Sequence, residues 1–155
     1  MHGRPEDEEM LPLDEGGFYR ILYTSPMRIS LPHGERPLAS SIFYALTEEQ
    51  PIGMLHRNRS DIIHFLIDGG PIEYLTYSSD GVLSRSRMDE SERFLLVPGG
   101  EAKASRLVDG ATYGRVAEVV VPGFDYADRD FVTEEELWSF PHLVDVLSPF
   151  LAPAR

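Results

Sequence analysis

Residues 53–71, GMLHRNRSDIIHFLIDGGP, decide the interpretation of this chain. They place His56, Arg57, Asp61 and His64 among apolar residues and end in a Gly-Gly-Pro turn. Side chains that move protons or hold an anion therefore lie next to buried backbone. Because this stretch gathers so many such side chains, we expect the functional site to be built around it.

Length and composition predict one domain without disulfides. The chain has 155 residues, enough for a hydrophobic core without cross-links, and it has no cysteine. The lack of cysteine excludes a disulfide framework, a thiolate metal site and a cysteine nucleophile. We expect residues 13–155 to form a single domain and residues 1–12 to form a flexible tail or an arm that docks on a partner subunit.

The charge balance argues against nucleic-acid and membrane partners. With 26 acidic and 14 basic residues, the net charge of -12 repels phosphate backbones and anionic lipids. No apolar run approaches the roughly 18 residues that span a bilayer, and the N-terminal residues are acidic where a signal peptide is basic. We therefore expect a cytoplasmic protein.

Short apolar and alternating segments predict an all-β fold. Expected strands cover residues 18–24, 40–46, 62–67, 72–77, 82–88, 94–97, 104–108 and 115–121, and a loop and a turn are expected at 26–37 and 47–53. Eight or more strands at such intervals indicate an antiparallel barrel or jelly roll. Helix signals occur only near the end. Thr133 and Glu136 form a capping box, and a second helix starting at Pro141 carries an apolar stripe of Leu143, Val146, Leu147 and Phe150.

Six motifs, in order along the chain, resemble the small cupin family of unknown function, DUF985. They are EGGFYR at 15–20, SIFYAL at 41–46, HRNRSDIIH at 56–64, VPGG at 97–100, VVPGFD at 120–125 and FPHL at 140–143. The resemblance implies a cupin jelly-roll barrel, commonly a homodimer, similar in shape to sugar-nucleotide epimerases and germin-like proteins. It does not name a reaction, because one fold serves many functions.

The metal positions of the family are largely lost. A metal-binding cupin holds its ion with two histidines and a glutamate from the first motif and a histidine from the second. The matching positions here are His56, Asn58, Ile62 and Lys103. Since one histidine is left and Lys103 places a cation where the metal would sit, we expect no metal and no other cofactor. His64 could join His56 only with help from Glu73 or Glu118.

Further departures from the family suggest a remodelled cavity. Ile62 and Ala102 stand where the family has a glutamate and a tryptophan, and Ala102 opens room if its side chain faces inward. Glu118 interrupts the apolar segment 116–121. A carboxylate among valines has a raised pKa unless it is paired, which is typical of general acids and bases.

We consider five residues as catalytic candidates, and each has a structural alternative. His56 and His64 could instead be hydrogen-bonded structural histidines, and Asp61 could cap a turn. Glu73 is a candidate only if its strand face lines the barrel interior. The catalytic candidates are His56, His64, Asp61, Glu118 and Glu73.

A second group of candidates would contact the substrate. The arginines could bind an anion or pair with surface acids, the lysine could be a solvent-exposed loop residue, and the tyrosines could belong to the core. These substrate-binding candidates are Tyr19, Arg20, Tyr44, Arg57, Ile62, Ala102 and Lys103.

Two functions from different classes follow. The first is a metal-independent enzyme in which a barrel pocket carries out acid-base chemistry, as in an isomerase, epimerase, lyase or cyclase, on a specialised metabolite or sugar. The second is a non-catalytic small-molecule binding module. A metal-dependent cupin oxygenase is the third hypothesis, and the ligand losses weaken it.

Overall fold

The structure of this chain is a computed structural model that describes residues 9–153. Most of the expected N-terminal tail, residues 1–12, lies outside the described residues. In the described part of this tail, β1 (Leu11–Pro12) pairs with β2 (Phe18–Thr24). No described helix is long and apolar enough to cross a membrane.

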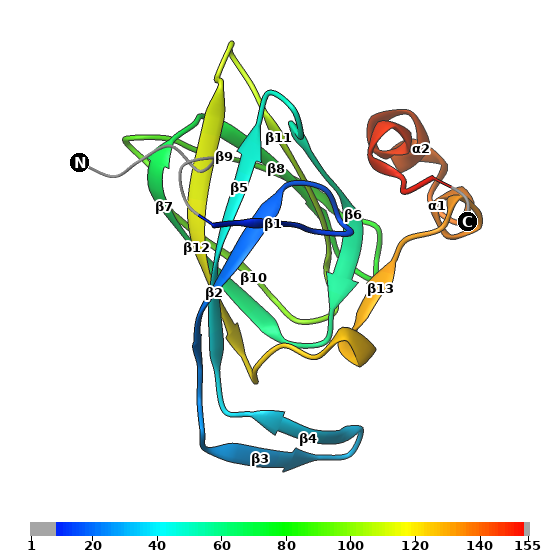
Figure 1. Cartoon of the computed structure of the whole chain (residues 1–155). Coiled ribbons are helices and arrows are strands. Elements are labelled where there is room, and N and C mark those ends of the chain that lie inside the picture. The colour runs from blue at the N-terminus through cyan, green and yellow to red at the C-terminus, as the bar shows by residue number, and fades with distance from the viewer. Residues whose placement is uncertain (1–8, 154–155) are drawn as a thin grey trace.

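Two antiparallel sheets face each other and enclose the barrel interior (Figure 1). The six-stranded sheet has the order β1, β2 (Phe18–Thr24), β5 (Ser40–Thr47), β12 (Tyr113–Val121), β7 (Asp61–Gly69) and β10 (Phe94–Val97). The five-stranded sheet has the order β13 (Arg129–Phe131), β6 (Ile52–Asn58), β11 (Ala102–Leu107), β8 (Ile72–Tyr77) and β9 (Leu83–Met88). This arrangement confirms the predicted antiparallel barrel.

Two segments differ from the sequence-based prediction. The segment expected to be a loop contains the hairpin of β3 (Arg28–Leu31) and β4 (Gly34–Pro37), which extends below the barrel in Figure 1. Its prolines lie in the turn and at the strand ends, where a missing N–H removes little pairing. The expected turn at 47–53 ends earlier, because β6 begins at Ile52 and pairs with β11 and β13.

The C-terminal helices cover the outer side of the five-stranded sheet (Figure 1). In α1 (Glu134–Trp138) the Thr133 hydroxyl accepts a hydrogen bond from the Glu136 N–H, as the capping box predicted. The apolar stripe of α2 (Pro141–Leu147) and η3 (Ser148–Phe150) packs against Leu55 and Leu75 of the sheet. The predicted docking of this stripe on the barrel is confirmed.

The barrel interior is divided into a filled half and a hollow half. Alternate side chains of a strand point to the same face. Along β5, Ser40, Ile42 and Tyr44 line a cavity, whereas Leu46 packs with Leu66 and other residues of an apolar cluster. The apolar cluster therefore closes one end of the barrel, and the cavity occupies the other.

Candidate functional site

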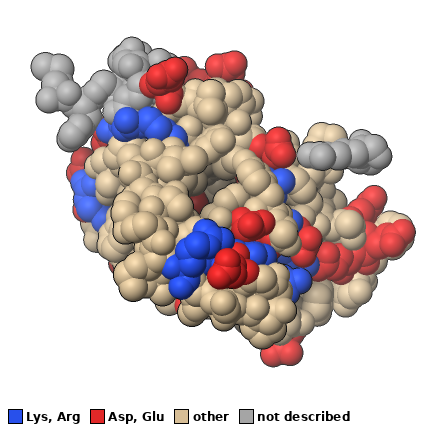
Figure 2. Space-filling view, turned by 60° about the horizontal axis from the view of Figure 1, so that its bottom comes forward, with Lys and Arg blue, Asp and Glu red and all other residues tan. Residues whose placement is uncertain are grey.

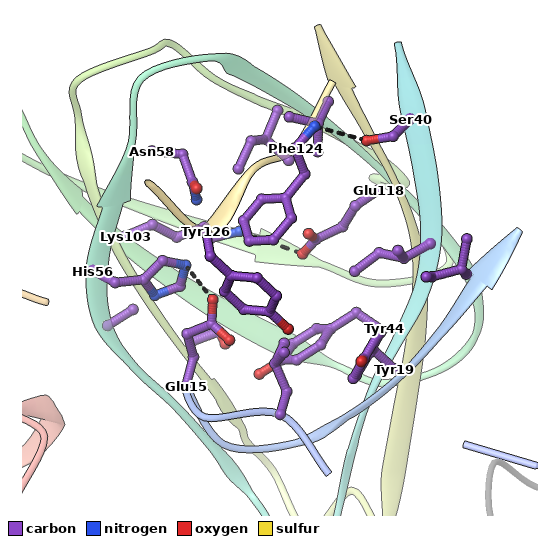
Figure 3. Close-up of a pocket in the computed structure, with 17 residues that line it drawn as sticks. Glu15, Tyr19, Ser40, Tyr44, His56, Asn58, Lys103, Glu118, Phe124 and Tyr126 are labelled. Carbon is purple, nitrogen blue, oxygen red and sulfur yellow. Dashed lines mark hydrogen bonds and ion pairs between the residues drawn. The ribbon is translucent and has the colours of Figure 1, made fainter. Parts of the chain in front are cut away.

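The cavity has a volume of about 160 Å³ and is lined by both sheets and by η2 (Tyr126–Asp128) with the segment before it (Figure 3). Its aliphatic wall is formed by Leu13, Ile21, Ile42, Ile62 and Val120. The four positions that would hold a metal in a metal-binding cupin, His56, Asn58, Ile62 and Lys103, all line this cavity. The spacing of the sequence motifs thus brings these positions together in space.

A buried polar cluster, formed by Lys103, His64 and Glu118, lies at the cavity wall. The Lys103 ammonium donates to His64 Nε2 at 2.9 Å and to Glu118 Oε1 at 3.3 Å. The His64 ring is completely buried, and Lys103 and Glu118 are exposed by only 6% and 7%. Lys103 is the only lysine of the chain.

Hydrogen bonding fixes the tautomer of His64. Its Nδ1 lies 3.1 Å from the carbonyl oxygen of Leu95, which can only accept, so Nδ1 carries the proton. Nε2 therefore offers its lone pair to the Lys103 ammonium. Burial, and then the charge of Lys103, lower the pKa of His64. The imidazole is neutral in this arrangement.

Glu118 is held as a carboxylate. Burial acts to raise its pKa, but the charge of the Lys103 ammonium, which donates to Glu118 Oε1 at 3.3 Å, outweighs burial, and the pKa lies well below its usual value. The cross-strand register explains the meeting, because Glu118 of β12 lies opposite His64 of β7. The sequence predicted a raised pKa for Glu118 unless this carboxylate is paired. Lys103 pairs with it, and its pKa is lowered.

His56 has an unprotonated ring nitrogen, Nε2, near the carboxyl group of Glu15. Its Nδ1 lies 2.7 Å from the carbonyl oxygen of Met54 and so carries the proton, while Nε2 lies 3.8 Å from Glu15 Oε1. Burial, and next the charge of Lys103, lower the pKa of His56 to about 3. His56 is therefore a neutral acceptor, and Figure 3 shows the His56 and Glu15 side chains turned towards each other.

Glu15 has the opposite pKa shift from Glu118. Burial raises its pKa, although the Arg129 guanidinium, 3.3 Å away, acts in the other direction. The left-handed residues Gly16 and Gly17, with φ of 87° and 75°, turn the chain so that Glu15 enters the cavity. The Tyr44 hydroxyl fastens this turn by donating to the Gly16 carbonyl oxygen at 2.9 Å.

Aromatic side chains form much of the remaining wall. Phe124 and Tyr126 pack edge to face with ring centres 4.9 Å apart, and the Phe124 N–H donates to Ser40 Oγ at 2.9 Å. Figure 3 shows both rings reaching across the cavity from the segment that follows β12. Tyr19 and Tyr44 contribute from the six-stranded sheet.

The structure separates the sequence-based candidates into two groups. Those at the site are His56, Glu118, Tyr19, Tyr44, Ile62 and Lys103, which line the cavity, and His64, which lies behind Lys103. Glu15, Asn58, Phe124 and Tyr126 also line the cavity but were not among the catalytic or substrate-binding candidates. Glu15, Asn58 and Phe124 lie within family motifs, which was the one signal that could have identified them.

The other candidates do not line the cavity. Asp61 accepts a hydrogen bond from the Gly99 N–H at 2.8 Å, and Glu73 pairs with Arg106 at 2.8 Å. Ala102 packs beneath the C-terminal helices, so its small size opens no room in the cavity.

Both arginine candidates also point elsewhere. Arg57 forms an ion pair with Glu136 and donates to the Tyr77 hydroxyl at 3.2 Å. The Arg20 guanidinium lies 5.3 Å from the centre of the Phe43 ring. Neither arginine provides an anion-binding group for the cavity.

The donor set does not fit the divalent ion of metal-binding cupins. Among residues 9–153, no group of three or more His, Asp or Glu side chains is placed to hold a metal. The lone pair that His64 could offer is occupied by the Lys103 ammonium at 2.9 Å. The ammonium group thus stands among the residues that would have to bind the ion.

Comparison with known proteins agrees with the motifs. A family model described as Cupin superfamily (DUF985) matches residues 6–132. An uncharacterised protein of Saccharomyces cerevisiae is 31% identical over 158 aligned residues, which cover 89% of this chain and 77% of the yeast protein.

Solved structures show the same fold. A hypothetical protein from Leishmania major superposes with a TM-score of 0.85 at 25% identity and covers 94% of both chains. Oxalate decarboxylase from Bacillus subtilis has a TM-score of 0.58 at 16% identity, with 92% of this chain and 37% of that chain covered. The second likeness shows the fold alone.

We predict that the buried polar cluster is strongly coupled. Lys103→Met leaves the buried Glu118 carboxylate without its cation, and we expect it to lower the free energy of unfolding by about 3–5 kcal/mol. The double variant Lys103→Met/Glu118→Gln should recover part of this loss, because the unpaired charge is gone. Urea denaturation of the wild type, both single variants and the double variant measures the coupling. Additive effects of the two substitutions would contradict it.

The neutral state of His56 predicts a loss of stability in mild acid. Its pKa is about 3 in the folded protein and 6.5 in the reference state, so below pH 6.5 the unfolded chain binds the additional proton. Between pH 7 and pH 5, His56 should therefore cost the folded state about 2 kcal/mol. Urea denaturation at both pH values should show that the free energy of unfolding falls less between pH 7 and pH 5 in His56→Gln than in the wild type. An equal loss in the two proteins would show that His56 titrates normally.

Proposed function

The chain belongs to the DUF985 family of the cupin superfamily, and we propose that it is a metal-independent enzyme. It would carry out acid-base chemistry on a small molecule in the barrel cavity. The observation that supports this most strongly is the bare Nε2 of His56, which faces the cavity beside Glu15. Isomerisation, epimerisation, elimination and cyclisation all require such proton transfer in a shaped cavity.

In this proposal His56 and Glu15 move the proton. The unprotonated Nε2 of His56 accepts a proton from substrate, and Glu15 in its acid form returns one. Two titratable groups whose pKa values are shifted in opposite directions are a common basis for dividing such roles. Here burial raises the pKa of Glu15 and lowers the pKa of His56.

Lys103 supplies the electrostatic part of the reaction. It lies opposite His56 across the β11–β6 ladder, so the two side chains share the face that lines the cavity. An ammonium in a water-poor site stabilises negative charge that develops on a substrate oxygen. As this charge forms, it also offsets the effect by which Lys103 lowers the pKa of His56. Proton abstraction and charge stabilisation are thereby coupled.

A non-catalytic binding module is the alternative, because the same cavity could hold a ligand without reaction. The homodimer and the cytoplasmic location stay predictions from the sequence. The exposed apolar side chains Phe65, Phe94 and Leu96 on the six-stranded sheet support the homodimer. A metal-dependent oxygenase receives no support from the donor set described above.

Proton abstraction can be tested before the substrate is known. The protein is incubated in D₂O, with a chelator, with a panel of keto sugars, keto acids and small ketones, and exchange of the hydrogens next to the carbonyl group is followed by proton NMR. We expect catalysed exchange in at least one compound, and a decrease of roughly 100-fold or more in His56→Gln. The exposed Glu90→Gln variant is the control and should keep the wild-type rate.

Two results would count against the enzyme. Ligand-induced shifts in the protein spectrum without exchange would favour the binding module. Exchange that occurs in a sample without the chelator and is absent with the chelator would show that the reaction depends on a metal.

A further inference from the structure

The cavity has the size of one ring. A cavity of about 150 Å³ is enough for a benzene-sized molecule, and this one measures about 160 Å³. Rings from Tyr19, Tyr44, Phe124 and Tyr126 supply flat apolar surfaces at its wall. Such walls favour a planar or cyclic ligand over an extended chain.

The polar end of the cavity contains three acceptor atoms to which no described residue donates a hydrogen bond. Asn58 Oδ1 is buried and accepts no hydrogen bond from the residues that the structure describes, and Asn58 itself is only 8% exposed. The proton of His56 is used by Met54, so its Nε2 is a second bare acceptor. Glu15 Oε2 is also without a hydrogen-bond partner among residues 9–153. Buried acceptors are normally satisfied, so these atoms indicate a ligand that donates hydrogen bonds.

The Tyr44 hydroxyl and two of the three N–H groups of the Lys103 ammonium are directed to other acceptors, namely the Gly16 carbonyl oxygen, His64 and Glu118. Among residues 9–153 no donor makes a hydrogen bond to Asn58 Oδ1 or Glu15 Oε2, so a ligand can supply it. A hydroxyl group suits this end, because its oxygen can also accept a hydrogen bond from Glu15 when that carboxyl group is protonated.

The charges around the cavity balance locally. Lys103 is paired with Glu118, and Glu15 lies 3.3 Å from Arg129. An anionic ligand would meet two carboxyl groups and a cation that is already paired, and a cationic ligand would meet Lys103. On the outer surface, Figure 2 shows arginine side chains lying beside Asp and Glu on the face it presents.

From these observations we propose that the cavity binds an uncharged, single-ring organic molecule whose hydroxyl group donates a hydrogen bond to Asn58. This names the substrate class of the proposed enzyme and rests on the assignment of function to the same cavity. It places phosphorylated and carboxylated compounds outside the class that the site accepts.

Three probes of similar size separate the contributions of the ring, the hydroxyl donor and a negative charge to the binding affinity. Phenol has a ring and a hydroxyl donor, fluorobenzene has the ring without the donor, and benzoate adds a negative charge. Each is titrated into the uniformly ¹⁵N-labelled full chain, and the backbone amide shifts give the dissociation constants. We expect phenol to shift residues around Asn58 and Tyr126, to bind about threefold to tenfold more tightly than fluorobenzene, and to bind at least about tenfold more tightly than benzoate.

A substitution locates the hydrogen bond. In Asn58→Leu, phenol and fluorobenzene should bind with nearly equal affinity, because the acceptor has been removed and the volume is similar. If this variant does not fold, the comparison of the three probes with the wild type decides the matter. Tighter binding of benzoate or of inorganic phosphate, no binding of phenol at the cavity, or an unchanged preference for phenol in folded Asn58→Leu would overturn the proposal.

The failure of this proposal can be distinguished from failure of the proposed function. Phenol has no keto group, so its binding is measured separately from hydrogen exchange next to a carbonyl. Exchange by the wild type together with tighter binding of benzoate would overturn the ligand class and leave the enzyme intact. Binding of phenol as expected, without exchange in any carbonyl compound, would leave the ligand class and favour the binding module.

Discussion

The buried Lys103 ammonium, held between the Glu118 carboxylate and the His64 imidazole, is the interaction on which the site depends. A charge so deep in a barrel is tolerated only with a close counter-charge and full hydrogen bonding. The register of β12 on β7 and the position of Lys103 on β11 supply the counter-charge of Glu118 and two hydrogen-bond acceptors. The charge states of Glu118, His64 and His56 all depend on this fixed positive charge.

The same charge explains why the cavity has two chemically different ends. It keeps Glu118 ionised and, with burial, holds His56 neutral, whereas Glu15 lies beyond its strongest influence and is governed by burial. A metal-binding cupin places a divalent cation among its ligands, and here a lysine supplies a single positive charge. The barrel thereby keeps a cationic centre, and in the proposed function this centre serves proton transfer and hydrogen bonding instead of ligand coordination.

The fold was largely predictable from the sequence, and the site only in part. Alternating apolar segments and turn residues located most strands, and the family motifs brought His56 and Lys103 to one cavity. The positions of Asp61 and Glu73 outside the cavity were not predictable, because residue type does not reveal that they pair with Gly99 and Arg106. Glu15 enters the cavity through a two-glycine turn in another part of the chain, and such long-range placement leaves no local periodicity in the sequence.

The structure makes Lys103 a buried ammonium that is hydrogen-bonded to His64 and Glu118. Because it is the only lysine of the chain, selective ¹⁵N labelling of lysine reports on this side chain alone. A proton–nitrogen correlation spectrum at pH 7 should show a slowly exchanging ammonium signal, because burial and hydrogen bonding protect its protons from water. A signal lost to rapid exchange with solvent, as expected for an exposed lysine, would show that the Lys103 ammonium is not buried and hydrogen-bonded.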